Sequence, residues 1–214
     1  MQDIFLSISM ATAVLGAVDA TKMWEPKPVA ECHIQYRLGK VQDCDHIRRV
    51  FFSTGFAYYE EKDAPTEFHF NAKWNGIWAK RLTDPDQLYI VAETEIYPGH
   101  PEIIGFCRFQ RGRKLQNDCK IITSNYNVEL MSLFVLPNWK RRGIGARMMR
   151  IGASRAIKAF SFEEAFCWCV DNKESQAFYQ SMGCSALMTR KDKLGGTQIA
   201  FSLDLNALKE MLVG

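Results

Sequence analysis

The sequence lacks the cysteine pattern that marks disulfide-rich and zinc-binding proteins. It has seven cysteines, an odd number without repeated metal-ligand spacing, which argues against a disulfide framework or a structural zinc site. Cys167 and Cys169 alternate along a predicted strand, so zinc is not expected there either. We therefore predict reduced thiols, a cytoplasmic setting and no metal ion.

Charge of one sign is also scarce. No run of like charges extends beyond Lys140–Arg142, and the formal net charge is only +3. Nucleic-acid binders usually carry a broader basic surface, so we expect no nucleic-acid partner. A nucleic-acid-binding protein that uses the segment Lys140–Arg155 stays open as an alternative, and it would bind oligonucleotides with a steep salt dependence.

The N-terminal region has no apolar run long enough to cross a bilayer. Residues Met1–Ala20 are mildly apolar, but polar side chains interrupt them and the segment is too short to span a membrane. The start carries Asp3 and lacks Lys and Arg, so a cleaved signal peptide is not expected. We predict no membrane partner and a cytoplasmic location, with a nuclear location left open.

Length and composition suit one globular domain with a short appendage. The chain has 214 residues, of which 47% are hydrophobic and 24% are charged, and this is enough for a sizeable core. The segment Glu25–Val29 contains Pro26 and Pro28 and is typical of a linker. We therefore predict an N-terminal extension at 1–30 and a domain at 31–214.

Alternating and helical hydrophobic patterns predict a mixed α+β chain. The predicted helices are Asp43–Tyr59, Pro65–Leu82 and one that begins after Gly143. The predicted strands are His33–Leu38, Leu88–Glu93, Ile103–Phe109, Val128–Val135, Ala165–Val170, Leu187–Arg190 and Gln198–Leu203.

The stretch Asn127–Ala146 consists of an apolar strand, a basic glycine turn and the start of a helix. Gly143 and Gly145 let main-chain N–H groups come close to a ligand, and the positive end of a helix favours phosphate groups. The side chains of Lys140–Arg142 add positive charge at the same place. The helix carries a one-sided apolar stripe that would hold it against a sheet, at Ile144, Met148, Ile151, Ala156 and Ala159.

This turn does not have the spacing of a Walker loop. It fits a dinucleotide fingerprint poorly, because Met148 stands where a third small residue is needed. It does match V-x-P followed by [QR]-x-x-G-x-[GA], through Val135, Pro137 and Lys140–Gly145. The pattern resembles the acetyl-CoA signature of the GNAT superfamily of N-acetyltransferases. Lys140 departs from it, because the family usually has Gln or Arg there, so the charge is kept and the planar donor geometry is lost.

A second block strengthens the resemblance. It begins at Asp171, 26 residues after Gly145 (171 − 145), and reads DNKESQAFYQSMGC. The family has an Asn, a small residue, an aromatic–Tyr pair and a Gly in this order. A helix would place most of these side chains on one face and end at the glycine. The matching residues are Asn172, Ser175, Phe178, Tyr179 and Gly183.

The resemblance implies a GNAT fold, with a central, mixed and mostly antiparallel twisted sheet of six to seven strands flanked by helices. It implies acetyl-CoA as co-substrate and direct transfer of the acetyl group to an amine in a ternary complex. The acceptor, a small molecule or a protein terminus, stays open, as does the choice between monomer and homodimer. The cofactor-binding residues implied are Leu133, Phe134, Val135, Lys140, Arg141, Arg142, Gly143, Ile144, Gly145, Ala146, Asn172, Ser175 and Phe178.

Glu129 is the candidate general base, which would remove a proton from the amine before attack. It lies 11 residues before Lys140 (140 − 129), the spacing of the catalytic carboxylate in the histone-acetylating branch of the superfamily. Strand parity places it on one face with Met131, Leu133 and Val135, where desolvation would raise its pKa. The resemblance implies a bulge in this strand, which would change that parity, and a water chain is the alternative base.

Tyr179 is the candidate general acid, because it matches the family's tyrosine near the CoA sulfur. A phenol is protonated at neutral pH and can give its proton to the leaving thiolate. Asn172 or Asp171 is expected to cap its helix, with Glu174 completing a box from Asp171. Cys169 is a conceivable nucleophile, but a buried strand thiol is usually inert.

The two predicted helices after the first strand would wall the acceptor site in this fold. Their aromatic and acidic side chains either receive the amine or belong to the core and the solvated surface. These residues are Glu60, Glu61, Asp63, Phe68, Phe70, Trp74 and Trp78. The alternative to an enzyme is a non-catalytic acyl-CoA-binding or regulatory module that keeps the cofactor turn.

Overall fold

The computed structural model describes residues 27–28, 31–55, 76–115, 126–191 and 196–212. Seven strands form one sheet in the order β1-β2-β3-β4-β5-β7-β6, with β4 and β5 parallel and the other neighbours antiparallel. This confirms the expected mixed, mostly antiparallel sheet. The strands are β1 Ile34–Leu38, β2 Gln87–Tyr97, β3 His100–Arg111, β4 Val128–Val135, β5 Glu164–Val170, β6 Ser185–Lys191 and β7 Thr197–Asp204.

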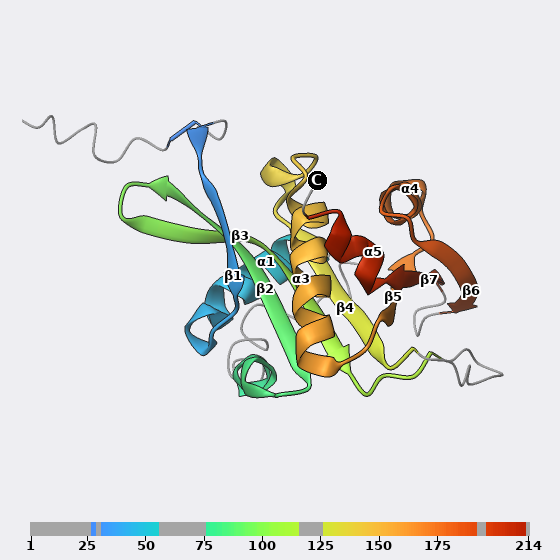
Figure 1. Ribbon diagram of the computed structural model, residues 1–214. Helices are drawn as coiled ribbons and strands as arrows, with labels where there is room; N and C mark the ends of the chain where they lie inside the picture. The colour runs from blue at the N-terminus through green and yellow to red at the C-terminus, as the bar shows by residue number, and fades with distance from the viewer. Residues whose placement is uncertain (1–26, 29–30, 56–75, 116–125, 192–195, 213–214) are drawn as a thin grey trace, which may run out of the picture.

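Helices cover both faces of the sheet (Figure 1). α3 (Ile144–Phe160) crosses one face with α5 (Leu205–Glu210) beside it, and α4 (Lys173–Ser181) follows β5. α1 (Cys44–Gly55) packs against β3 and β4, and a further helical segment spans 76–83. No helix in the described part of the chain is long and apolar enough to cross a membrane.

The two faces of the sheet have separate cores. On the α3 face the core includes Phe109, Leu130 and Met148. On the α1 face it includes Ile47, Trp78 and Phe106. Trp78 is only 2% exposed, and its ring packs edge to face against three aromatic rings, with centroids 5.6–6.4 Å apart. It therefore belongs to this core and does not line an acceptor site. The other six residues predicted for the acceptor wall lie outside the described residues.

Most predicted elements are confirmed within the described residues, and the deviations have local causes. Positions 56–59 of the first predicted helix and 65–75 of the second lie outside the described residues. β2 and β3 are longer than predicted because they continue into a hairpin, where Tyr97 pairs with His100. Ala159, predicted in the apolar stripe of α3, is exposed, while Met149 and Phe160 are buried. The sequence interpretation missed α5, although its N-cap is a standard signal: Asp204 accepts a hydrogen bond from the Ala207 N–H at 2.9 Å.

The centre of the sheet is where its pairing is thinnest. β4 and β5 are in register at Glu129 and Phe166. Beyond this pair, β4 continues along β3 as far as Val135, and β5 continues along β7 as far as Val170. The carboxyl halves of β4 and β5 therefore use their outer neighbours, and the sheet opens between them. The glycine turn that follows β4 lies at this opening.

α3 lies so close to the sheet that one position requires glycine. A Cβ atom on Gly152 would lie 2.4 Å from Cε2 of Phe109, and Phe109 is fully buried. We expect Gly152→Val to lower the free energy of unfolding by about 3 kcal/mol, the upper part of the range for overpacking. Urea unfolding followed by circular dichroism measures this loss.

The same substitution at Gly76 is the matched control. Gly76 is also helical, but no atom lies within 4 Å of its Cβ position. We expect Gly76→Val to change the free energy of unfolding by less than about 1 kcal/mol. Equal losses in the two variants would show that the contact with Phe109 does not limit the position of α3.

Candidate functional site

The glycine turn adopts a backbone conformation that exposes main-chain donors. Arg141 and Gly143 both have positive φ, 60° and 74°, and α3 begins at the next residue, Ile144. The first hydrogen bond of the helix runs from the Arg147 N–H to the Gly143 carbonyl at 2.9 Å. The N–H groups of Ile144, Gly145 and Ala146 precede it and have no acceptor within the helix. Such a turn at a helix N-terminus can hold a phosphate group.

The basic side chains surround this turn without filling it. Lys140, Arg141 and Arg142 are exposed, and the Arg142 guanidinium lies 5.7 Å from the ring centroid of the buried Trp139. Arg141 and Glu174 are 3.9 Å apart with side chains 88% and 73% exposed, which makes this a weak surface pair. The charge of the cluster is therefore accessible to an anionic ligand.

The structure brings the two sequence blocks together. A Cβ atom on Gly145 would lie 3.8 Å from the Phe178 ring and 3.9 Å from Val135, so the turn, α4 and the end of β4 meet. Asn172 caps α4, because its Oδ1 accepts a hydrogen bond from the Ser175 N–H at 2.8 Å. Ser175 and Phe178 are half-buried, and Gly183 ends this motif with a φ of 78°.

The capping box predicted from Asp171 to Glu174 is wrong. Asp171 lies before the cap, and its Oδ1 accepts a hydrogen bond from Nε2 of Gln176 at 2.7 Å. Asn172 takes the N-cap position, one residue later than the box requires. Both residues are good caps by type, so the sequence alone left the choice open.

A β-bulge in β4 overturns the predicted parity. Phe109 pairs with Leu130, and Arg108 pairs with Ser132, so Met131 is an extra residue. Val128 and Leu130 belong to the α3-side core, as do the half-buried Leu133 and Val135. Glu129 therefore faces the α1 side of the sheet, the side of the half-buried Phe134.

Glu129 lies in a polar environment that the sequence did not reveal. It is 6% exposed, and its Oε2 accepts a hydrogen bond from Nε of Arg113 at 2.9 Å. The loop before β4 delivers this arginine, because the Gly112 N–H donates to the Asn127 carbonyl at 2.8 Å. The buried carboxylate thus has a cationic partner at the one strand pair shared by β4 and β5.

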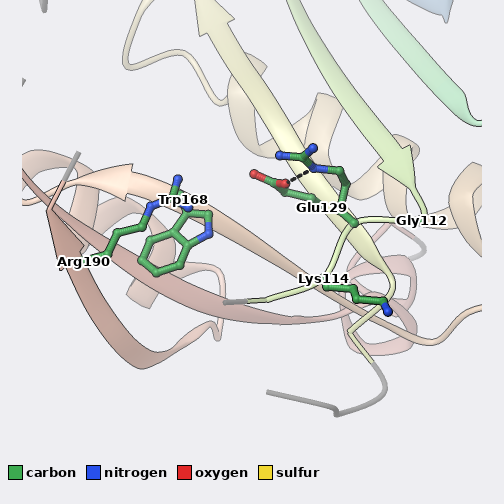
Figure 2. A pocket seen from close by; sticks show the side chains of 6 residues that line it. Gly112, Lys114, Glu129, Trp168 and Arg190 are labelled. Atoms are coloured by element: carbon green, nitrogen blue, oxygen red, sulfur yellow. Dashed lines mark hydrogen bonds and ion pairs between the residues drawn. The ribbon is translucent and has the colours of Figure 1, made fainter. Parts of the chain in front are cut away.

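A small cavity opens beside Glu129 (Figure 2). Its other lining residues come from the β3–β4 loop and from strands β5 and β6, and the sequence interpretation assigned none of them to a site. One of them, Trp168, could have been found from the alternation along β5, which places it on the face opposite Cys167 and Cys169. The lining residues are Gly112, Arg113, Lys114, Glu129, Trp168 and Arg190.

Tyr179 lies on the other face of the sheet, in the α3-side core. It is 8% exposed, and its ring stacks on Phe201 with centroids 5.4 Å apart. Burial raises the pKa of the Tyr179 phenol well above its ordinary value, and the neighbouring thiols, including a hydrogen bond with Cys167, raise it further. The two candidate catalytic groups are therefore not in contact, because Glu129 and Tyr179 face opposite sides of the sheet at its opening.

The cysteine thiols near Tyr179 are poor nucleophiles. Burial raises the pKa of Cys169 to about 11 and that of Cys184 to about 12, so both are protonated at neutral pH. A thiolate is the reactive form. No cluster of metal-ligating side chains occurs in the parts of the chain that the structure describes.

An open sheet with one parallel strand pair and a glycine turn beside the opening defines a class of small mixed α+β domains. The chain belongs to one family within it: the sequence model of the Acetyltransferase (GNAT) family matches residues 46–184, more than half of the 214 residues. The expected family is thereby confirmed.

Solved structures show the same fold at low sequence identity. The yncA protein of Salmonella typhimurium, solved with its cofactor acetyl-CoA, is 16% identical, with a TM-score of 0.55 over 80% of this chain and 94% of its own. The ribosomal-protein-S18-alanine N-acetyltransferase of Escherichia coli is 13% identical, with a TM-score of 0.56 over 81% of this chain and 94% of its own. A comparison with curated protein sequences finds no match.

Proposed function

We propose that the protein transfers the acetyl group of acetyl-CoA to an amine by direct attack in a ternary complex. The observation that carries this proposal is the meeting of the glycine turn, α4 and the end of β4 at the opening of the sheet, where Gly145 lies against Phe178 and Val135. The structure of yncA with acetyl-CoA supports the choice of cofactor, since its fold is the same.

The residues at the turn fit acetyl-CoA. Nothing lies within 4 Å of the Cβ position of Gly143, so an anion has room beside the N-terminus of α3. The N–H groups of Arg141–Ala146 would bind the pyrophosphate, and Lys140, Arg141 and Arg142 would add charge. The main chain of Leu133, Phe134 and Val135 would bind the pantetheine amides, with Asn172, Ser175 and Phe178 beside it. Acetyl-CoA supplies an acetyl group activated as a thioester.

Glu129 and Tyr179 would move the two protons of the reaction from opposite sides of the opening. The ammonium form of the acceptor gives a proton to Oε1 or Oε2 of Glu129, directly or through water. The free amine forms a C–N bond with the acetyl carbon while the C–S bond breaks. The nitrogen then releases its second proton to solvent, and Glu129 afterwards gives up the first proton to solvent as well. Tyr179 gives its phenol proton to the leaving sulfur and regains a proton from solvent. A base on the acceptor side and an acid on the cofactor side suit a donor held between them.

Binding and turnover test the proposal separately. Acetyl-CoA at a hundred times its Kd should stabilise the native state by about 2.7 kcal/mol, visible in thermal unfolding, with CoA and a simple nucleotide as controls. Mass spectrometry of amines incubated with enzyme and acetyl-CoA then detects transfer. Binding without transfer to any amine would favour a non-catalytic acyl-CoA-binding module, and the absence of a stabilising effect at millimolar ligand would contradict the cofactor site.

Glu129→Gln tests the proposed base. We expect kcat/KM for the amine to fall by about 10²–10⁴-fold, the usual contribution of a positioned general base, while the Kd for acetyl-CoA stays the same. Initial rates and calorimetry measure the two quantities.

Glu164→Gln is the matched control, because Glu164 is an exposed carboxylate at the start of β5. It should retain the rate of the wild-type enzyme. Equal rates in wild type and Glu129→Gln would exclude Glu129 as the base and favour a water chain without it.

A further inference from the structure

The carboxylate of Glu129 has one hydrogen-bond partner among the described residues. Its Oε2 accepts a hydrogen bond from Nε of Arg113 at 2.9 Å, drawn as the dashed line in Figure 2. No described residue donates to its Oε1. Glu129 also lines the adjacent cavity, which has a volume of about 210 Å³. One oxygen of the buried carboxylate is thus held by the protein, and the other is left for a ligand in the cavity.

The backbone that carries Arg113 is fixed on both sides. The N–H groups of Gly112 and Arg113 both donate to the Asn127 carbonyl, at 2.8 and 3.3 Å. Two residues later, Leu115 is fully buried in a small core against β5 and β7. The Arg113 side chain remains 48% exposed, whereas that of Glu129 is 8% exposed. A fixed loop therefore brings a solvated cation to a buried anion.

The other cations that line the cavity do not take this role. Lys114 follows Arg113 in the same loop, but its side chain points away from Glu129 in Figure 2. Arg190 lies on the opposite side of the cavity, with its guanidinium carbon 3.9 Å from the ring centroid of Trp168. Arg113 is the lining cation that contacts the carboxylate.

The neighbouring elements, as far as the structure describes them, bring no second ion-pair partner to Glu129. Gln110 of β3 pairs with Glu129, and Arg108 lies two residues earlier on the same face of that strand. Arg108 donates to the Tyr89 hydroxyl at 3.5 Å, and β5 contributes the apolar Phe166 in register with Glu129. The described ion pairs of α1 join its own residues to one another or to β3, at Asp45, Arg48, Arg49 and Glu102. Within the described residues, the loop arginine is therefore the counter-ion of the proposed base.

We propose that Arg113 is a positioning residue for the base: it fixes Oε2 and keeps the buried carboxylate ionised, so that Oε1 receives the proton of the acceptor ammonium from the cavity. The inference rests on the proposed function. In this step an N–H bond of the ammonium breaks and an O–H bond forms at Oε1. The carboxyl group is then neutral, and it passes its proton to solvent through the cavity after the transfer. Arg113 itself neither gives nor takes a proton.

The charge and the exposure of Arg113 both suit this role. Burial favours the neutral form of a carboxyl group, which cannot act as a base, and a neighbouring guanidinium favours the ionised form. When Glu129 takes up the proton, Arg113 loses its counter-ion. Because its side chain is half exposed, water then solvates the guanidinium, and no buried charge is left unpaired. A fully buried arginine at this place would oppose the proton transfer.

A double-mutant cycle tests whether Arg113 acts through Glu129. At about pH 6 we expect Arg113→Gln to lower kcat/KM for the amine by roughly 10-fold, because a hydrogen bond to a charged group is lost. In the Glu129→Gln background the same substitution should change the residual rate by less than about twofold, since there is no carboxylate left to position. Equal losses in both backgrounds would overturn the inference.

The pH dependence of the rate gives a second test, with one acceptor amine throughout. In Arg113→Gln, burial acts on the carboxyl group without the nearby cation, so the acid limb of kcat/KM should move upward by at least about one pH unit. Arg113→Lys keeps the charge and should keep the wild-type limb. Arg111→Gln is the matched control, because Arg111 is exposed and pairs with Asp86, and it should not move the limb. An unmoved limb in Arg113→Gln would contradict the proposed role.

These outcomes differ from a failure of the proposed function. If the wild-type enzyme acetylates no amine, the proposed function fails and the inference fails with it. If amines are acetylated but Arg113→Gln matches the wild type at every pH, only the role of Arg113 is wrong. NMR of the isotopically labelled Glu129 carboxyl group needs no turnover: its titration should move to higher pH in Arg113→Gln, and an unchanged titration would also overturn the inference. Thermal midpoints check that each variant is folded.

Discussion

Gly143→Glu is expected to abolish acetyl-CoA binding, with a Kd raised by about 100-fold or more. The residue stands immediately before α3 with a φ of 74°, so its backbone lies where the pyrophosphate is proposed to bind. A carboxylate there would face two phosphate charges, and like-charge juxtaposition costs several kcal/mol. Calorimetry measures the Kd for acetyl-CoA, and thermal unfolding shows whether acetyl-CoA still stabilises the variant.

Two controls separate this repulsion from backbone strain. Gly99 has a φ of 76° in the β2–β3 hairpin and no atom within 4 Å of its Cβ position, so Gly99→Glu should incur a similar strain of roughly 1–2 kcal/mol without affecting acetyl-CoA. Gly143→Asn tolerates positive φ and adds no charge, so it should weaken binding only modestly. In addition to these controls, Arg141→Ala should weaken acetyl-CoA binding only modestly, because that side chain is 88% exposed. Unchanged affinity in Gly143→Glu would remove the turn from the cofactor site.

The glycine turn and α4 could be predicted because their features are local. Positive φ selects glycine at Gly143 and Gly183, and the cap at Asn172 is a short-range hydrogen bond. The β4 bounds follow from a mainly apolar run that ends shortly before Pro137. Each depends on residues within a few positions along the chain. Local chemistry of this kind is visible in a sequence without knowledge of the tertiary contacts.

The surroundings of Glu129 could not be predicted, because they depend on the register of β4 and on contacts between strands. The bulge at Met131 reverses the face of every residue before it relative to those after it. The family resemblance implies a bulge in this strand, but no residue type there marks its position. Arg113 reaches Glu129 only because the loop is fixed to Asn127. Arg190 and Trp168 meet because β7 pairs with both β5 and β6, a topology that spacing along the chain does not show.

Tyr179→Phe is expected to lower kcat by about 10²–10⁴-fold, the range for a lost general acid, while the Kd for acetyl-CoA stays nearly the same. Phenylalanine keeps the stacking on Phe201 and the edge contact with Phe178, so the helix α4 and the cofactor turn should be unaffected. Only the hydroxyl and its hydrogen bond with Cys167 are lost. Single-turnover rates and calorimetry separate transfer from binding.

The same change elsewhere controls for the loss of a hydroxyl. Tyr36→Phe alters a half-buried tyrosine on β1, the edge strand four positions away from β5, which α4 contacts, and it should keep the rate of the wild-type enzyme. If Tyr179→Phe keeps the full rate, then solvent and not Tyr179 protonates the leaving sulfur.

The pH dependence tests the state of the Tyr179 proton. Its pKa is raised above the ordinary value of 10.0, chiefly by burial, so the phenol stays protonated, and competent as an acid, at every pH below about 10. The wild-type rate should therefore show no loss from phenol ionisation up to that pH.

The stability of the protein depends on pH in the same direction. The phenol ionises first in the unfolded state, so the contribution of Tyr179 to the free energy of unfolding is complete below pH 10 and declines above it. Tyr179→Phe should lack this part of the alkaline decline in stability. The buried, protonated state would be contradicted if the wild-type rate fell with an apparent pKa below 10, in step with a phenolate absorbance that is absent from Tyr179→Phe.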